Sequence, residues 1–413
     1  MDNNVLFEDL IKDTSFVMAN SGSLMHSRIK IPTPLYVVND IFGGGIPLGI
    51  ISEISGPPGS GKSTFSYQTA GIFQRTVPNG IVIILDQESS MDVSRLEILG
   101  VDPKRVLRLP ATTMENAFKN LFMILEKVKS KIDNGEITQL YVIYDTISTG
   151  GTDKQHQATI DGRSVMNAGG MQEAARILKQ NIANIFPYLE TIPIHFSMLN
   201  QVFTQMGMYT SSVASGGGYG LKHGAHLHIN FSKGTEVSDS GQYKGFLTQN
   251  KGSVNLNKSK LSPKFTDIPC NIDIRKGGVI DEVGSFVEYV SRSNIDIVTM
   301  GSWYNIKKTI PIMIESYGIS TDSLEKYNKN YRKDDFYNLV RDDKDLLLLL
   351  QVRLIDFINE IYPGQKEVNE GYKEELMRQC SYFQELNKET AFWYELVSRV
   401  HKETEVIENV AVQ

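Results

Sequence analysis

Apolar runs alternate with amphipathic stretches along the larger, first part of the chain. Five runs are apolar enough to be strands buried on both faces of a parallel sheet. They lie at residues 50–54, 81–86, 140–145, 192–201 and 225–231. Apolar residues at helical spacing predict helices over residues 63–74, 115–131 and 171–189. This order predicts an α/β fold whose mostly parallel central sheet is covered by helices on both sides.

The two ends of the chain differ from this alternating part. Residues 5–18 carry apolar side chains at helical spacing and predict a short N-terminal helix. A segment around Asn250-Lys251-Gly252 predicts a β-hairpin within residues 246–256, and after about residue 281 the pattern becomes helical. We therefore expect an N-terminal segment at residues 1–34, an α/β core at 35–281 and a mostly helical C-terminal domain at 282–413.

Composition narrows the class of protein. The chain is 41% apolar and 22% charged, as soluble globular proteins are. Its two cysteines cannot form a disulfide framework, so a reducing cytoplasm is the expected compartment. No apolar run approaches 18 residues and the N-terminus does not resemble a signal peptide, so we expect no membrane span.

The net charge of -6 is unevenly distributed. Residues 331–413 hold 17 acidic and 11 basic residues, which leaves the rest of the chain neutral. A neutral core can still carry local basic patches, so the overall charge does not exclude a nucleic-acid partner.

One motif predicts nucleotide binding directly. The sequence matches the complete G-x-x-x-x-G-K-[ST] phosphate loop, placed between a predicted strand and a predicted helix. The loop comprises Gly56, Pro57, Pro58, Gly59, Ser60, Gly61, Lys62, Ser63 and Thr64. Its glycines let backbone N–H groups turn toward a polyphosphate at the helix N-terminus. We expect Lys62 to reach the β- and γ-phosphates of ATP or GTP, and Ser63 to bind Mg²⁺.

Polar side chains follow three of the predicted strands. Asp145 ends the run 140–145, where a carboxylate is expected to hold Mg²⁺. Glu88 follows the run 81–86, so it could orient and deprotonate an attacking water. Gln201 ends a further strand and could sense the γ-phosphate. Because the carboxyl ends of parallel strands share one edge of the sheet, these side chains are expected to lie together.

Two segments rich in Gly, Ser and Met predict long loops, at residues 149–170 and 203–220. The candidate contacts to nucleic acid in and beside these segments are basic side chains, the backbone amides of a glycine triplet and a methionine that could insert between bases. They are Arg163, Met166, Arg176, Gly216, Gly217, Gly218 and Lys222. Lys258 and Lys260 alternate on one strand face and could supply charge to a phosphate on a neighbouring subunit. The histidines show no metal-ligand spacing, so a zinc site is not expected.

Taken together, these residues resemble the RecA recombinase family, most closely the phage recombinases of the UvsX type. The resemblance runs from about Leu35 to Tyr304. It includes the phosphate loop, Asp86-Gln87-Glu88, the strand of Asp145, Asn200-Gln201 and Lys258-Ser259-Lys260. The most specific part is the stretch from Gly216 to Ala225, which is similar to the family's second DNA loop and the helix that follows it.

The resemblance implies a RecA-like ATPase core that forms a helical filament on single-stranded DNA, with ATP and Mg²⁺ between protomers. It implies homologous pairing with double-stranded DNA, Glu88 as the base that activates water, and Gln201 as a link from the γ-phosphate to the DNA loop. Lys258 and Lys260 would reach the ATP of the adjacent protomer, and residues 1–25 of the N-terminal oligomerisation segment 1–34 would pack on a neighbouring protomer. Single-strand-binding and loader proteins are open as partners, and the cytoplasm would be that of the host if a phage encodes the chain.

The match to the family is incomplete at several positions. Asp92 matches a residue beside the adenine, but Arg95 stands where the bacterial proteins have an aromatic residue, so its guanidinium could stack on the base. Gly169 stands where they have an arginine in the first DNA loop, so we expect Arg163 and Arg176 to contact DNA in its place. The alternatives that remain open are a hexameric RecA-type helicase, a non-catalytic ATP-binding recombination mediator and an ATP-dependent signalling oligomer that acts on protein.

Overall fold

The computed structural model describes residues 29–383, apart from positions 43, 78, 90, 164–169, 207–210, 216–217, 239–246, 262–267, 292–294, 296 and 362–365. The chain divides after Phe286 into two compact units. The N-terminal helix expected at residues 5–18 lies outside the described part, as does the chain beyond Phe383.

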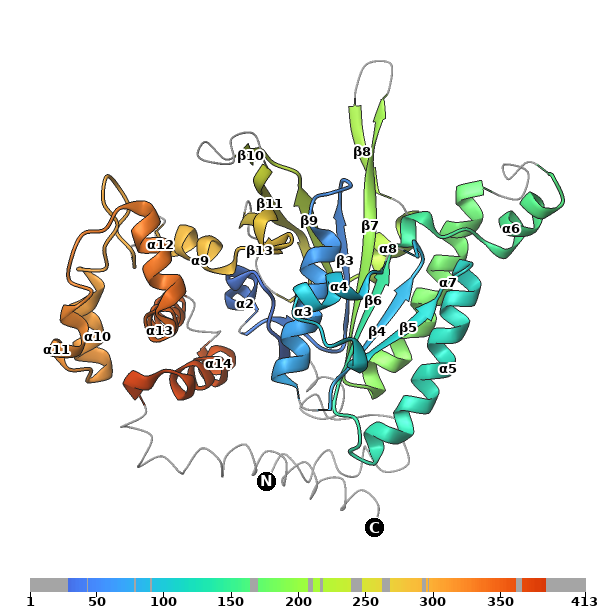
Figure 1. The fold of residues 1–413 in the computed structure, drawn as a ribbon. Coiled ribbons are helices and arrows are strands. Elements are labelled where there is room, and N and C mark those ends of the chain that lie inside the picture. Colours follow the sequence, from blue (N-terminus) through green and yellow to red (C-terminus); the bar gives the residue numbers. More distant parts are fainter. Residues whose placement is uncertain are drawn as a thin grey trace, which may run out of the picture. The chain divides into compact units, whose positions relative to one another are not determined.

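The first unit is built on an 11-stranded sheet (Figure 1). Its strand order is β13-β12-β11-β9-β3-β7-β6-β4-β5, with β10 beside β11 and β8 beside β7. The strands are β3 (Ile50–Gly56), β4 (Ile81–Asp86), β5 (Val106–Pro110), β6 (Leu140–Asp145), β7 (Ile194–Met206), β8 (Ser211–Ser215), β9 (Leu227–Ser232), β10 (Glu236–Ser238), β11 (Leu247–Ser259), β12 (Ile268–Asp273) and β13 (Val279–Ile280). All pairs from β9 through β3, β7, β6 and β4 to β5 are parallel, which confirms the predicted α/β class.

Helices cover both faces of this sheet (Figure 1). On one face, Phe73 of α3 (Lys62–Thr76) packs with its ring centroid 6.0 Å from that of Tyr141 on β6. On the other face, Phe118 of α5 (Met114–Asp133) lies 5.5 Å from Tyr144 of the same strand. Tyr141 and Tyr144 are three residues apart and therefore point to opposite faces of the sheet. The core on the α5 side also buries α7 (Gly170–Thr191).

Shorter elements complete the first unit. They are the two-stranded sheet of β1 (Lys30–Ile31) and β2 (Ile46–Pro47), the helices α2 (Tyr36–Ile41), α4 (Val93–Ile98), α6 (Asp153–Ile160) and α8 (Gly218–Gly224), and the 3-10 turns Pro103–Arg105, Ile147–Thr149 and Ile274–Lys276.

The hairpin predicted around Asn250-Lys251-Gly252 is wrong. β11 runs straight through these residues and pairs with β9, β10 and β12. Gly252 is needed for close packing and not for a turn, because a Cβ there would lie 2.6 Å from the carbonyl oxygen of Ser232 on the neighbouring strand.

The two segments predicted as long loops contain regular structure. In the first, α6 begins with a capping box in which Thr152 and Gln155 exchange side-chain to backbone hydrogen bonds. In the second, β7 continues to Met206, β8 pairs with it antiparallel, and α8 begins at Gly218 (Figure 1). Strand β5 and helix α4 were not predicted at all. The polar outer face of β5 hides its strand pattern.

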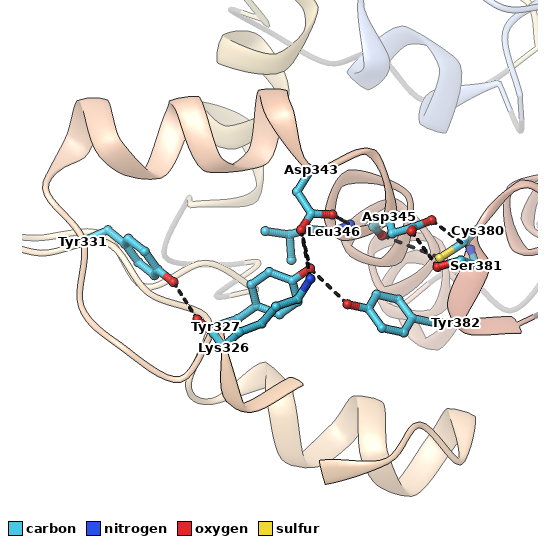
Figure 2. Close-up of polar contacts among 9 residues, drawn as sticks. All are labelled: Lys326, Tyr327, Tyr331, Asp343, Asp345, Leu346, Cys380, Ser381 and Tyr382. Carbon is cyan, nitrogen blue, oxygen red and sulfur yellow. Dashed lines mark hydrogen bonds and ion pairs between the residues drawn. The ribbon is translucent and has the colours of Figure 1, made fainter. Parts of the chain in front are cut away.

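From residue 282 onward, the described elements are helical. They are α9 (Glu282–Val290), α10 (Thr309–Tyr317), α11 (Thr321–Glu325), α12 (Lys333–Asp342), α13 (Lys344–Ile361), α14 (Lys366–Gln379) and a 3-10 turn at Ser381–Phe383. Figure 2 shows polar contacts that join the residues after α11, the junction between α12 and α13, and the 3-10 turn. Tyr327 donates to Asp343 Oδ2 at 2.6 Å and contacts the hydroxyl of Tyr382 at 3.0 Å. Ser381 donates to Asp345 through its backbone N–H and its hydroxyl.

None of the described helices has both the length and the apolar character that a membrane span requires.

Candidate nucleotide and nucleic-acid site

The phosphate loop connects β3 to α3 at the carboxyl edge of the sheet. Gly59 and Gly61 have φ angles of 71° and 100°, which L side chains rarely adopt. A Cβ on Gly61 would also lie 2.5 Å from Ile272 Cδ1. These two glycines therefore form the loop that the motif predicts, with α3 starting at Lys62.

Lys62 is directed into this loop. Its Nζ donates to the carbonyl oxygens of Gly56 and Pro57, both at 2.9 Å. Burial lowers the pKa of Lys62, and the charges of Asp145 and Glu88 oppose that shift. The ammonium thus sits among neutral carbonyl groups, which anionic phosphate oxygens could replace as partners.

Asp145 ends β6, and its carboxylate is almost fully buried. It accepts a hydrogen bond from Tyr67, at 2.8 Å to Oδ2. Burial is the main cause that raises the pKa of Asp145, and the polar side chains of Tyr67 and Ser63 oppose that shift. A serine hydroxyl and a carboxylate are hard oxygen ligands of the kind Mg²⁺ prefers, so these residues fit that ion.

Glu88 lies just beyond β4 with an exposed side chain. Its Oε1 accepts a hydrogen bond of 3.0 Å from Gln201 Nε2 on β7. Partial burial and the charge of Asp145 raise the pKa of Glu88, while Lys62 and Gln201 act in the opposite direction. A raised pKa makes a carboxylate a better proton acceptor, which suits a general base.

Asp92 and Arg95 are the candidates for contacting the nucleotide base. Asp92 lies at the start of α4, and Arg95 lies on that helix. The carboxylate of Asp92 caps the helix by accepting from Ser94 N–H at 3.0 Å. Arg95 Nη2 donates to Thr64 Oγ1 at 3.0 Å and to the carbonyl oxygen of Gly278 at 3.2 Å. Its guanidinium is therefore held beside the end of the phosphate loop.

Lys258 near the end of β11 and Lys260 just after that strand differ in their surroundings. Lys258 Nζ donates to the carbonyl oxygens of Lys222, at 2.7 Å, and Ala225, at 3.0 Å, at the C-terminal end of α8. Burial, and then the charge of Lys260, lower the pKa of Lys258. Lys260 has an exposed side chain. In the single chain, Lys258 thus stabilises the helix that follows the glycine triplet.

The described candidates for DNA contacts lie just after α6, on α7 and on α8. Arg163 forms an ion pair with Asp161, and Arg176 donates to Glu173 at 3.0 and 2.9 Å. Lys222 is exposed on the last turn of α8, which Gly218 begins. Met166, Gly216 and Gly217 lie outside the described residues. The two arginines are therefore engaged in local pairs that phosphates would have to displace.

Sequence reasoning missed a buried polar network in the middle of the sheet. Glu53 of β3 accepts from Asn200 Nδ2 at 2.7 Å and lies 2.8 Å from His228 Nδ1. His228 Nε2 in turn contacts the carbonyl oxygen of Lys222 at 3.1 Å. An acid inside a buried strand, as Glu53 is, was the available signal, since buried carboxylates need partners.

Two further partners of the strand-end carboxylates were missed. Tyr67 donates to Asp145, and Arg108 of β5 donates to Asp86 Oδ2 through Nε at 2.9 Å and Nη2 at 2.7 Å. Because each pair is far apart in sequence, no local motif could have indicated it. Among the described residues, no group of His, Cys, Asp and Glu side chains has the arrangement of a metal cluster.

Residues 21–279 match the RecA N-terminal domain. Protein RecA of Helicobacter acinonychis is 29% identical over 270 residues, which are 64% of this chain and 71% of that protein. Protein RecA of Ureaplasma parvum is 26% identical over 311 residues, 73% of this chain and 86% of that protein. Protein RecA of Wolinella succinogenes is 28% identical over 270 residues, 64% of this chain and 70% of that protein.

Proposed function

This chain belongs to the RecA family, and we propose that it is a DNA-dependent ATPase that forms helical filaments on single-stranded DNA and catalyses homologous pairing and strand exchange. We include ATP and Mg²⁺ as cofactors, single- and double-stranded DNA and further copies of the chain as partners, and the cytoplasm as the compartment. The kinship to phage recombinases of the UvsX type stays a prediction.

The hydrogen bond between Gln201 and Glu88 is the observation that supports this function best. It joins the candidate base to β7, which continues through Met206 and pairs with β8 ahead of the glycine triplet. A DNA strand bound at that segment could shift Gln201, and with it the carboxylate that faces the attacking water. The arrangement thus offers a direct mechanical route by which DNA could control hydrolysis.

Hydrolysis would use the residues around the phosphate loop. The backbone of Gly56–Thr64 and the ammonium of Lys62 would hold the phosphates, and Ser63 with Asp145 would hold Mg²⁺. Bound Mg²⁺ neutralises charge on the phosphate oxygens. Glu88 would orient a water molecule and take its proton as the water oxygen bonds to the γ-phosphorus, while ADP leaves. Asp92 and Arg95 would contact the base, and Lys258 and Lys260 the ATP of an adjacent protomer.

The decisive test is ATP hydrolysis with and without single-stranded DNA over a range of protein concentrations, with light scattering recorded in parallel. A recombinase filament predicts strong stimulation by DNA that rises cooperatively with protein, together with growing scatter. Stimulation at a fixed small oligomer size would instead identify a ring helicase. DNA binding without hydrolysis would identify a mediator, and hydrolysis indifferent to DNA would identify a signalling oligomer.

Lys260→Ala tests the contribution of an adjacent protomer more cleanly than a change at Lys258, because only Lys258 also stabilises α8 in its own chain. We expect Lys260→Ala to reduce DNA-stimulated hydrolysis at saturating protein by at least tenfold, since a charge that stabilises the transferring phosphate from a neighbouring subunit is worth more than that. Lys251→Ala, at an exposed lysine on β11, serves as the control. Equal rates for both variants would remove Lys260 from the site.

A further inference from the structure

One face of α3 presents two hydroxyl groups to a single carboxylate. Ser63 and Tyr67 are four residues apart, so they lie one turn apart on the same side of the helix. Tyr67 donates a hydrogen bond to Asp145 Oδ2 at 2.8 Å, and the side chain of Ser63 helps to hold the pKa of the same carboxylate down. Ser63 belongs to the phosphate loop motif, whereas Tyr67 belongs to no motif.

The position of Tyr67 is fixed by packing. Its side chain is 6% exposed and Asp145 is 4% exposed. On the same face of the sheet, Phe73 of α3 packs against Tyr141 of β6 at 6.0 Å. Helix α3 is therefore attached to β6 by an apolar contact at one end and by the Tyr67–Asp145 hydrogen bond near the phosphate loop. A buried phenol needs a polar partner, and this one has the carboxylate expected to hold Mg²⁺.

We propose that Tyr67 is a positioning residue for the magnesium site: its hydroxyl holds Asp145 Oδ2 and thereby orients the carboxylate toward Ser63. This inference rests on the proposed ATPase function. Residues that hydrogen-bond to a metal-binding carboxylate fix its orientation, and their removal commonly weakens metal affinity by about 10- to 100-fold. A phenylalanine would bury the same ring, so burial of the ring alone does not explain a tyrosine here.

The test is Tyr67→Phe in the full chain. Binding of a fluorescent ATP analogue is followed while Mg²⁺ is titrated, and binding without Mg²⁺ is measured in EDTA. We expect the Mg²⁺ concentration at half-maximal binding to rise about tenfold, with Mg²⁺-independent binding unchanged because the phosphate loop is intact. Tyr141→Phe is the matched control, since it removes another buried hydroxyl from β6, one that contacts Ser197 Oγ at 3.2 Å.

A double-mutant cycle with Asp145→Asn keeps the proposal testable even if Tyr67→Phe lowers stability. If Tyr67 acts through Asp145, adding Tyr67→Phe to Asp145→Asn does not shift the Mg²⁺ concentration at half-maximal binding any further. An unchanged midpoint in Tyr67→Phe, or an equal shift in Tyr141→Phe, would overturn the positioning role. If the unaltered chain binds no nucleotide at any Mg²⁺ concentration, the proposed ATPase function itself fails, a result distinct from either of these.

Discussion

Each of the two units contains an aspartate that accepts a hydrogen bond from a tyrosine, and the two pairs have different surroundings. In the first unit, Tyr67 donates to Asp145 at 2.8 Å. In the second, Tyr327 donates to Asp343 at 2.6 Å, as Figure 2 shows. Asp343 also accepts from the backbone N–H of Leu346 at 3.0 Å and from Lys326 Nζ at 3.2 Å. Lys62 affects Asp145 by its charge and not by a hydrogen bond, because its ammonium group donates to the carbonyl oxygens of the phosphate loop.

The pKa values of the two aspartates move in opposite directions. Burial raises the pKa of Asp145 and outweighs its hydrogen bonds. Burial also acts to raise the pKa of Asp343, but the bonds from Tyr327, Leu346 and Lys326 together outweigh it and lower that pKa. A carboxylate whose charge is fully compensated caps a helix, here α13, and stabilises the fold. One whose charge is incompletely compensated is suited to receive a cation. The same side-chain pair can thus cap a helix in one unit and support the proposed magnesium site in the other.

The largest effect expected from this contrast is on activity. Glu88→Gln removes the candidate base while the amide can still pair with Gln201, so we expect DNA-stimulated hydrolysis to fall by at least about 100-fold with nucleotide binding retained. Glu190→Gln, at an exposed position near the end of α7, is the control and should hydrolyse ATP normally. Hydrolysis by Glu88→Gln at the normal rate would show that the carboxylates of the first unit do not carry the chemistry.

The next effect is on stability, and it should have opposite signs in the two units. Asp145→Asn can still accept from Tyr67 but removes a poorly compensated buried charge, so we expect the first unit to become more stable by about 1 kcal/mol. Asp343→Asn loses the ion pair with Lys326, so we expect the second unit to become less stable by about 1 to 2 kcal/mol. Hydrogen exchange of peptides from β6 and from α13, without Mg²⁺ or nucleotide, would measure the two changes separately. Destabilisation at both positions would contradict the comparison.

The parts of the molecule that could be predicted from the sequence are those with a local cause. The phosphate loop needs glycines at fixed spacing and a strand and helix on either side, so Gly56–Thr64 was recognisable without the fold. The strands of Asp145 and Gln201 follow from apolar runs in the same way. The match to the RecA N-terminal domain then confirmed the family.

The features that could not be predicted depend on contacts between distant segments. Gly252 was read as part of a turn, but its role is set by the carbonyl of Ser232 on the adjacent strand. Likewise, the bonds of Tyr67 to Asp145 and of Arg108 to Asp86 exist only once the sheet has brought these residues together. Short-range patterns identify a site's motif residues, whereas the side chains that position them are chosen by the tertiary fold.

The smallest effect is a difference in how acid changes the two units. Because the pKa of Asp343 is lowered, its stabilising charge is fully present above the ordinary value of 3.8 and is lost only as the pH falls through the lowered pKa. The stability difference between the unaltered chain and Asp343→Asn should therefore stay constant from pH 7 to about 5 and shrink only in stronger acid.

For Asp145 the pKa is raised, so its destabilising charge is neutralised at a pH above 3.8. The difference between the unaltered chain and Asp145→Asn should then begin to shrink at a higher pH than that of Asp343→Asn. Hydrogen exchange of the two units, corrected for the intrinsic pH dependence of exchange, measures both transitions in one series. If the two differences shrink over the same pH range, the contrast between the aspartates is wrong.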